Sequence, residues 1–174
     1  MKKIISIAIA VLLLTGRPAL ATVVSTFDGT DLDGWLASSD FNLTNPGSGG
    51  NTNNNGNDGY AQLGVEGAGV SDGLAIAPGL GALSGYASIS WDSLLPDNSN
   101  EYFGSVLLIV SNNTTSYTYT PFDKDGEADS WQNWEAPLVY GQGWQCTLGC
   151  STGLHELLAD NTVQIAFDLE VTWR

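Results

Sequence analysis

The only histidine in the chain lies in a segment that begins like a zinc-protease site. His155-Glu156 is followed by two leucines, but Ala159 stands where such a site needs its second histidine. A zinc protease holds its metal with both imidazoles on one helix face and uses the glutamate as a base. The segment therefore predicts no zinc chemistry.

Closely spaced carboxylates give a second candidate for catalysis. Residues 127–132 read Glu-Ala-Asp-Ser-Trp-Gln and are similar to the Glu-x-Asp-x-x-Glu strand of laminarinase-type glycosidases. That mechanism needs a nucleophile and a proton donor on one face of the strand, and Gln132 cannot serve as the acid. We therefore assign no catalytic residue and expect a protein that is not an enzyme. A secreted glycoside hydrolase ranks third, after a binding module and a structural component.

Oxygen-rich turns are the candidates for a metal site. One cluster contains Asp28, Asp31 and Asp33, and the other contains Asp123, Asp125, Glu127 and Asp129. Calcium takes about six to eight oxygen ligands from carboxylates and carbonyls, so each cluster is a candidate for a structural calcium ion. Ordinary hydrated turns are the alternative, because aspartate and glycine are common turn residues.

Six tryptophans suggest carbohydrate binding, because indole faces stack on the C–H faces of sugars. Four of them fall on the apolar face of an alternating run and are predicted core residues: Trp35, Trp91, Trp134 and Trp173. Trp131 and Trp144 have polar and glycine neighbours instead. We predict that these two side chains are exposed and bind the ligand.

The first 21 residues have the layout of a secretory signal peptide. Lys2 and Lys3 precede an apolar run over residues 4–14. Ala19 and Ala21 then place small residues at the two positions that a signal peptidase recognises. The run has 11 residues, fewer than the roughly 20 of a membrane-spanning helix. We expect cleavage between Ala21 and Thr22, residues 1–21 outside the folded core, no membrane insertion afterwards, and secretion to the medium or the periplasm.

Cleavage would leave an acidic chain. Three of the five lysine and arginine residues lie in the leader. The remaining chain has 19 carboxylates and two basic residues, Lys124 and Arg174, which gives a net charge of −17. Nucleic acid is excluded as a partner, because no basic surface is available to neutralise phosphates, and anionic membrane surfaces are disfavoured for the same reason. The charge suits a hydrated surface outside the cytoplasm.

The two cysteines are separated by three residues. Cys146 and Cys150 are expected to form a disulfide in an oxidising compartment. A loop this small stabilises the fold by about 2 kcal/mol at most, so the bond is expected to hold one loop only.

Short runs of alternating apolar residues predict an all-β fold. Val163–Trp173 has the strictest alternation, and weaker runs cover Thr22–Phe27, Trp35–Phe41, Tyr60–Val65, Gly85–Trp91, Phe103–Val110, Thr115–Phe122 and Trp134–Tyr140. Residues 153–159 predict one short helix, capped by Ser151 or Thr152. The pattern is typical of two packed antiparallel sheets, a sandwich or jelly roll. Residues 45–59 are expected to form a polar surface loop.

Several segments along the mature chain match one extracellular domain family. They are Phe27-Asp28-Gly29, Gly34-Trp35, the segment 58–63, Ala77-Pro78, Gly85-Tyr86, the segment 131–138 with Trp144, and the segment 154–160. With these segments the chain resembles secreted bacterial members of the laminin B (laminin IV type) domain family. The resemblance implies a jelly roll similar to galactose-binding domains, and such jelly rolls often hold a structural calcium ion.

The resemblance also sets an expectation for the end of the fold. In such domains a further strand follows the alternating one, so we expect a single domain over residues 22–174 that is either a shorter representative or a fragment. The strand over 163–173, or its neighbour, would then have an unpaired edge. We predict a non-catalytic module that binds a glycan or an extracellular matrix or surface protein. A structural component without a small ligand is the alternative.

Overall fold

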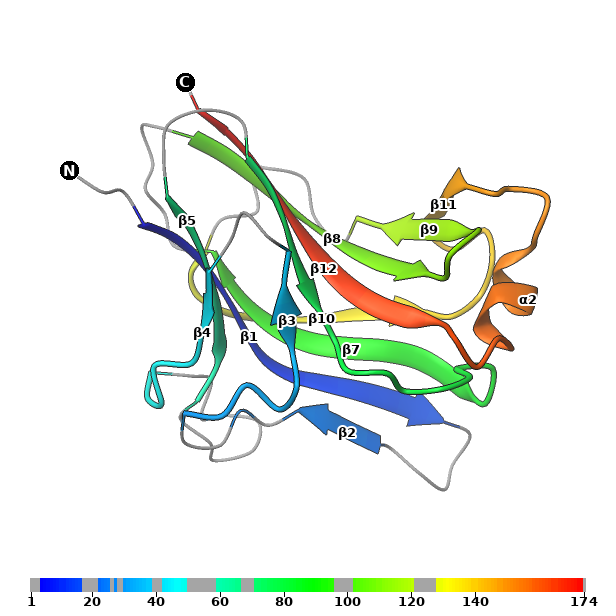
Figure 1. Cartoon of the computed structure of the whole chain (residues 1–174), viewed down its shortest axis with the longest axis horizontal. Coiled ribbons are helices and arrows are strands. Elements are labelled where there is room, and N and C mark those ends of the chain that lie inside the picture. Colours follow the sequence, from blue (N-terminus) through cyan, green and yellow to red (C-terminus); the bar gives the residue numbers. More distant parts are fainter. Residues whose placement is uncertain are drawn as a thin grey trace.

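The computed structural model is an antiparallel β-sandwich with one short helix (Figure 1). It describes the backbone of residues 4–16, 22–25, 27, 30–38, 42–49, 59–66, 71–95, 102–120 and 128–173. It describes the side chains of residues 27, 30–38, 42–49, 59–62, 74–94, 107–120 and 131–168. Both the all-β class and the two-sheet arrangement confirm the prediction.

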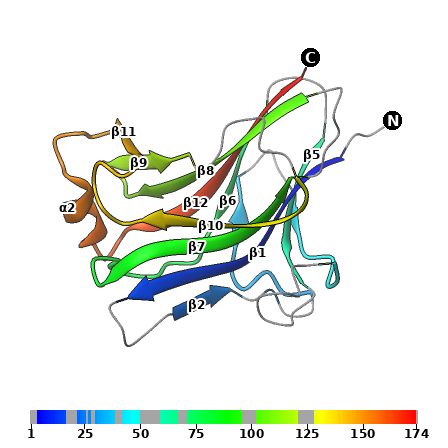
Figure 2. The same cartoon turned by 180° about the vertical axis from the view of Figure 1, so that it is seen from behind.

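The first sheet has six strands in the order β10-β7-β1-β5-β4, with β2 paired to β1 (Figure 2). They are β1 (Ile4–Gly16), β2 (Thr22–Ser25), β4 (Asn42–Thr44), β5 (Ala61–Glu66), β7 (Tyr86–Leu95) and β10 (Ala128–Pro137). Every strand pair in this sheet is antiparallel. The polar segment between β4 and β5, predicted as a loop, is described only at residues 45–49, 59 and 60.

The second sheet has six strands in the order β11-β9-β8-β12-β6-β3. They are β3 (Leu36–Ala37), β6 (Ser71–Ile76), β8 (Tyr102–Ser111), β9 (Ser116–Tyr119), β11 (Trp144–Leu148) and β12 (Gln164–Trp173). β12 is hydrogen-bonded to β8 on one side and to β6 on the other. The expected unpaired edge is therefore wrong for β12 itself. Its neighbours β6 and β8 pair on their far sides over part of their length only, at Ala75–Ile76 with β3 and at Leu108–Ser111 with β9.

Aromatic rings from both sheets form the centre of the core. Trp91 of β7 and Phe167 of β12 lie 5.3 Å apart between ring centroids, and Trp35 stacks on Phe167 at 5.9 Å. Phe27 packs on Trp35 at 5.8 Å and is fully buried. The prediction of core positions for Trp35 and Trp91 is confirmed. Trp134 packs against the core while partly buried, and the side chain of Trp173 lies outside the described residues.

The N-terminal apolar run occupies an interior position in the first sheet. β1 pairs with β5 through Ile4–Ile9, with β7 over most of its length, and with β2 near its end. The expectation that residues 1–21 stay outside the fold is thus wrong for residues 4–16. The cause is compositional: isoleucine, valine, leucine and alanine suit a buried strand as well as the apolar region of a signal peptide. Cleavage between Ala21, outside the described residues, and Thr22 stays a prediction.

The short helix lies at one end of the sandwich. α2 (Leu154–Leu158) buries Leu154, Leu157 and Leu158 against the core, which confirms the predicted apolar face. The predicted cap by Ser151 or Thr152 is wrong. The N-cap residue is Gly153, whose amide donates to the Glu156 carboxylate at 3.0 Å, so the helix begins with a residue that has no side chain to cap it.

Asp160 holds the end of this helix to the turn between β8 and β9. Its carboxylate accepts hydrogen bonds from the amide and the hydroxyl of Thr162, each at 2.8 Å, and from Asn112 Nδ2 at 2.8 Å. These bonds favour the charged form. The Thr162 amide, then the Thr162 hydroxyl and Asn112, therefore lower the pKa of Asp160 below its ordinary value.

The lowered pKa of Asp160 predicts a pH-dependent effect of Asp160→Asn on stability. A depressed folded pKa gives stability that is present above the unfolded pKa of about 3.9 and is lost as pH falls through the folded value. We expect the variant to melt a few degrees below the wild type at about pH 6, and the gap to close towards about pH 2. Melting curves across this range test it, and a constant gap would contradict it.

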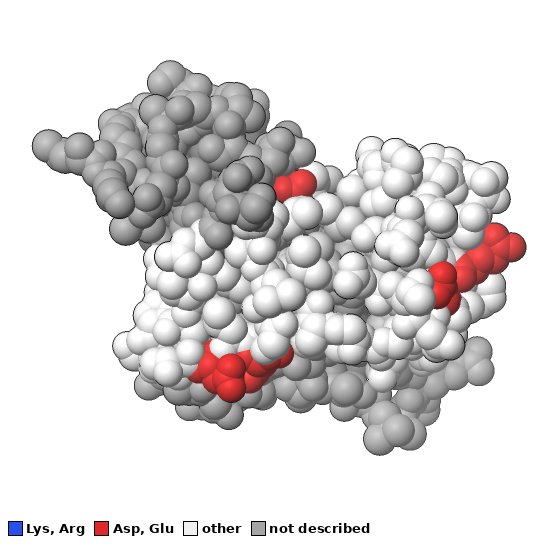
Figure 3. Space-filling view, in the orientation of Figure 1, with Lys and Arg blue, Asp and Glu red and all other residues white. Residues whose placement is uncertain are grey.

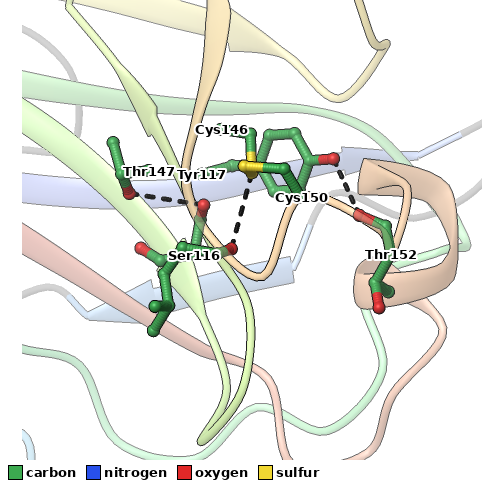
Figure 4. Close-up of a disulfide and its surroundings, with 7 residues drawn as sticks. Ser116, Tyr117, Cys146, Thr147, Cys150 and Thr152 are labelled. Carbon is green, nitrogen blue, oxygen red and sulfur yellow. Dashed lines mark hydrogen bonds between the residues drawn. A yellow bond between two sulfur atoms is a disulfide. The ribbon is translucent and has the colours of Figure 1, made fainter.

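The predicted disulfide between Cys146 and Cys150 is confirmed, with a Cα–Cα distance of 5.7 Å (Figure 4). It closes the turn after β11. Beside it, the Tyr117 hydroxyl donates to the Thr152 carbonyl at 2.8 Å, and the Thr147 hydroxyl donates to the Ser116 carbonyl at 3.3 Å. These contacts join β9, β11 and the segment before α2 into one corner of the sandwich.

Candidate functional site

Trp144 is a core residue and not an exposed platform. It is 5% exposed, its indole Nε1 donates to the Pro137 carbonyl at 2.5 Å, and its ring packs on Tyr119 at 5.4 Å. Gly143 fits against the same tyrosine ring, because a Cβ there would lie 2.6 Å from a ring carbon. The prediction that Trp144 binds ligand from an exposed position is therefore wrong. Glycine neighbours suggested a loop, but they permit close packing.

Trp131 lies outside the core, on β10. Its ring meets the Tyr60 ring edge-on, with 5.8 Å between centroids, and both side chains are half-buried. Tyr60 immediately precedes β5, and β7 and β1 lie between β10 and β5 in the sheet. The two rings therefore join opposite parts of the first sheet. Tyr60 was not predicted as a site residue, because only the tertiary fold brings it to Trp131.

Polar groups accompany Trp131 on β10. Asn133 is paired with Asp92 of β7, and its Nδ2 donates to Asp92 Oδ1 at 2.8 Å. Asp92 is only 1% exposed, whereas Asn133 is exposed. Because side chains alternate along a strand, Trp131, Asn133 and Glu135 share the face opposite to the core residues Trp134 and Ala136. We call Tyr60, Asp92, Trp131, Asn133 and Glu135 the Trp131 face.

The Trp131 face combines aromatic rings with hydrogen-bonding side chains, and a polar ring-shaped ligand can contact both. The indole and phenol rings offer flat apolar surface, and the Asn133 amide and Glu135 carboxylate offer hydrogen-bond partners beside it. Asp92 fixes the Asn133 side chain through their hydrogen bond. The arrangement can hold a ligand by stacking and by hydrogen bonding without any chemical step.

The described surface carries acidic side chains and no lysine or arginine. All five lysine and arginine residues lie outside the described ranges. Figure 3 shows acidic side chains in small separate groups on one face, with no lysine or arginine among them. A ligand for the described surface therefore meets carboxylates and neutral groups only, which disfavours anionic ligands.

The first predicted calcium cluster is partly described. The Asp33 carboxylate accepts a hydrogen bond from the Phe27 amide at 2.8 Å, and the Asp31 carboxylate accepts one from the Asp33 amide at 3.1 Å. Asp28 lies outside the described residues. Within the described part of the chain, no three His, Cys, Asp or Glu side chains group closely enough to hold a metal ion. The two carboxylates thus have a structural role in the turn.

The second predicted calcium cluster falls almost wholly outside the described residues. Asp123, Asp125 and Glu127 are not described, and of Asp129 only the backbone is described, at the start of β10. Calcium binding by this cluster therefore stays a prediction.

Asn45 and Gly59 hold the turn of the first cluster against the sheet. Asn45 Nδ2 donates to the carbonyls of Phe27 at 3.0 Å and of Asp31 at 2.5 Å, and Asn45 Oδ1 accepts from the amides of Gly47 and Tyr60. A Cβ on Gly59 would lie 1.6 Å from the Phe27 carbonyl oxygen. Asn45 and Gly59 therefore position Tyr60, and with it one edge of the Trp131 face.

A motif that sequence reasoning missed lies between β11 and α2. Residues 149–153 read Gly-Cys-Ser-Thr-Gly, the pattern of a serine nucleophile elbow between a strand and a helix. Ser151 and His155 are both exposed, and no hydrogen bond joins them in this described segment. Cys150, next to the serine, is in the disulfide. The pair that activates a serine is therefore not formed here.

Comparisons with family models, with curated proteins and with solved structures found no match for this chain. Among the described residues, no helix has the length and apolar character needed to cross a membrane.

Proposed function

We propose that this chain is an exported, non-catalytic module that binds a glycan through the Trp131 face. The observation that carries the proposal is the contact between Trp131 and Tyr60 beside the bonded pair of Asp92 and Asn133. Aromatic rings flanked by amide and carboxylate groups match a sugar, which has apolar C–H faces and a rim of hydroxyls. An extracellular protein carrying such a glycan is the corresponding macromolecular partner.

The charge of the protein favours a neutral glycan. The mature chain has a net charge of −17 under the proposed cleavage, and Asp92 and Glu135 bring carboxylates to the Trp131 face. Uronate or sulfate groups would be repelled there, because like charges at short range raise the free energy of the complex. Neutral hydroxyl groups accept and donate hydrogen bonds without that cost.

Export is part of the same proposal. The leader features of residues 1–21 and the disulfide at 146–150 both suit an oxidising compartment, either the medium or the periplasm. We propose that the mature domain is of the laminin B type. The all-β sandwich supports this proposal, as does Gly59, which belongs to the resembling segment 58–63 and stands at a position where no larger residue fits.

A glycan array tests the proposed function. Protein exported by a bacterial host from the complete gene is applied to matched neutral, sulfated and uronic-acid glycans at physiological salt. We expect binding to a subset of neutral oligosaccharides and none to the sulfated ones. An array without any binding, or binding only to anionic glycans, would refute the proposal.

Calcium is proposed as a structural cofactor of the turn that contains Asp31 and Asp33. Binding to the folded state alone adds about 2.7 kcal/mol at a hundredfold excess over Kd, so millimolar calcium should raise the melting temperature by several degrees. Magnesium should raise it less, because its octahedral shell is more demanding. Melting curves with calcium, magnesium or EDTA test this, and identical curves would leave Asp31 and Asp33 as backbone acceptors only.

Exposed apolar residues favour a second candidate, a structural role in an assembly. Leu148 on edge strand β11 is 55% exposed, and Leu36 on edge strand β3 is 66% exposed. Edge strands with exposed apolar side chains pair readily with other chains. Light scattering across a wide concentration range tests this role. Reversible association that is lost in Leu36→Lys or Leu148→Lys supports it, and a monomer at all concentrations argues against it.

A further inference from the structure

Removal of the leader would take a paired strand out of the first sheet. β1 lies within residues 1–21, whose cleavage belongs to the proposed function, and it pairs with β2, β5 and β7. Seven residues of β7, between Tyr86 and Leu94, have β1 partners. The exported chain would therefore have an open edge along β7.

That edge borders the core. Ile89 and Trp91 are 0% and 1% exposed, and Ser90 between them is 9% exposed. Backbone amide and carbonyl groups at such a position need hydrogen-bond partners, and an unpaired edge exposes the apolar residues next to it. Another segment must take the place of β1 if the sandwich is to keep its core.

Across the second half of β1, the strand that lies opposite β7 is β2. Leu13 of β1 pairs with Val23 of β2 on one side and with Ser90 of β7 on the other. Val23 is therefore level with Ser90 and only two strand spacings away, about 10 Å. A sideways movement by one spacing of about 4.8 Å brings β2 beside β7 with no displacement along the strand.

The chain after β2 is anchored close to the sheet and is still long enough to permit this movement. Phe27 is fully buried and is bonded to Asp33 and Asn45, and one residue separates it from Ser25, the last residue of β2. Two residue steps span up to about 7 Å, which is enough for one strand spacing. The residue types of β2 also suit the position, because threonine and valine are common in buried strands.

We infer that in the exported protein β2 moves into the place left by the second half of β1 and pairs directly with β7. Because β1 is antiparallel to both strands, the new pair runs parallel. The inference rests on the proposed cleavage of the leader. It keeps the first residues of the mature chain in the sheet that carries Trp131.

A cysteine pair tests this arrangement. Val23→Cys with Ser90→Cys is expressed from the complete gene, and the exported protein is analysed by mass spectrometry and thiol titration. We expect a chain that begins at Thr22 and has no titratable thiol, because neighbouring strand residues lie within disulfide distance. The control, Val23→Cys with Ser88→Cys, is displaced by about 6.6 Å along the strand and should retain both engineered thiols.

The outcomes separate this inference from the proposed function. Exported protein that retains Met1 would refute leader cleavage. Chains that begin at Thr22 but keep free thiols in Val23→Cys with Ser90→Cys, or form the new disulfide between two chains, would overturn the strand movement alone. If the variant is not exported, amide exchange on the unmodified exported protein decides. The amides that matter are those of residues 89–91 that point away from β10, towards the place left by β1. Slow exchange of these amides supports the movement, and fast exchange overturns it.

Discussion

Replacing Gly59 by alanine should lower the stability of the domain by about 3 kcal/mol. The new Cβ would lie 1.6 Å from the Phe27 carbonyl oxygen and 2.7 Å from its carbonyl carbon. Both contacts are with backbone, so no side chain can rotate away. Relief requires moving Phe27, whose buried ring packs on Trp35, and it breaks the bond from Asn45 to the Phe27 carbonyl. For a domain of this size we expect the melting temperature to fall by roughly 6–12 °C.

Gly79→Ala is the matched control for this substitution. A Cβ on Gly79 has no neighbour within 4 Å, and the position is exposed. The same change of residue type should therefore leave the melting temperature unchanged or raise it slightly, because alanine restricts the unfolded chain. Equal melting temperatures for Gly59→Ala and Gly79→Ala would contradict the packing described around Phe27.

Trp131→Ala should weaken glycan binding at least tenfold, which corresponds to about 1.4 kcal/mol. The substitution removes the largest apolar surface of the Trp131 face and leaves the bond between Asn133 and Asp92 in place. Stability should fall by about 1 kcal/mol only, since Trp131 is half-buried and its ring packs on Tyr60. Isothermal titration with a neutral oligosaccharide selected on the array measures the change in affinity.

Tyr140→Ala is the control for the aromatic contribution. Tyr140 is 69% exposed and packs edge-on against Tyr117 at the disulfide corner, away from the Trp131 face. Its removal should leave the affinity for the oligosaccharide within about twofold of the wild type. A loss of affinity in Tyr140→Ala, with Trp131→Ala unaffected, would move the binding surface to the other end of the sandwich.

Strict alternation made the long strands predictable. Six apolar residues at a period of two identified β12, and the runs at β7 and β8 were found within a few residues of their ends. β6 was missed because Ser71-Asp72-Gly73 begins it with polar and flexible residues. β1 was assigned to the leader alone, because an apolar run rich in isoleucine satisfies both interpretations. Periodicity cannot choose between them.

The candidate site depended on contacts between distant parts of the chain. Polar neighbours correctly placed Trp131 outside the core, since that pattern is local. The same reasoning failed for Trp144, whose partners Pro137 and Tyr119 lie in other strands. Tyr60 had no local signal at all. Its position follows from the Asn45 hydrogen bonds, which no periodic pattern shows.

The most direct test of the account is an NMR titration that follows the indole N–H signals of the six tryptophans. The exported protein is labelled at tryptophan nitrogen and titrated with the neutral oligosaccharide selected on the array. We predict that the Trp131 signal moves with a saturable dependence on ligand concentration, while Trp91 and Trp144, both buried, stay unchanged. Binding that shifts other signals and leaves Trp131 unmoved would contradict the account.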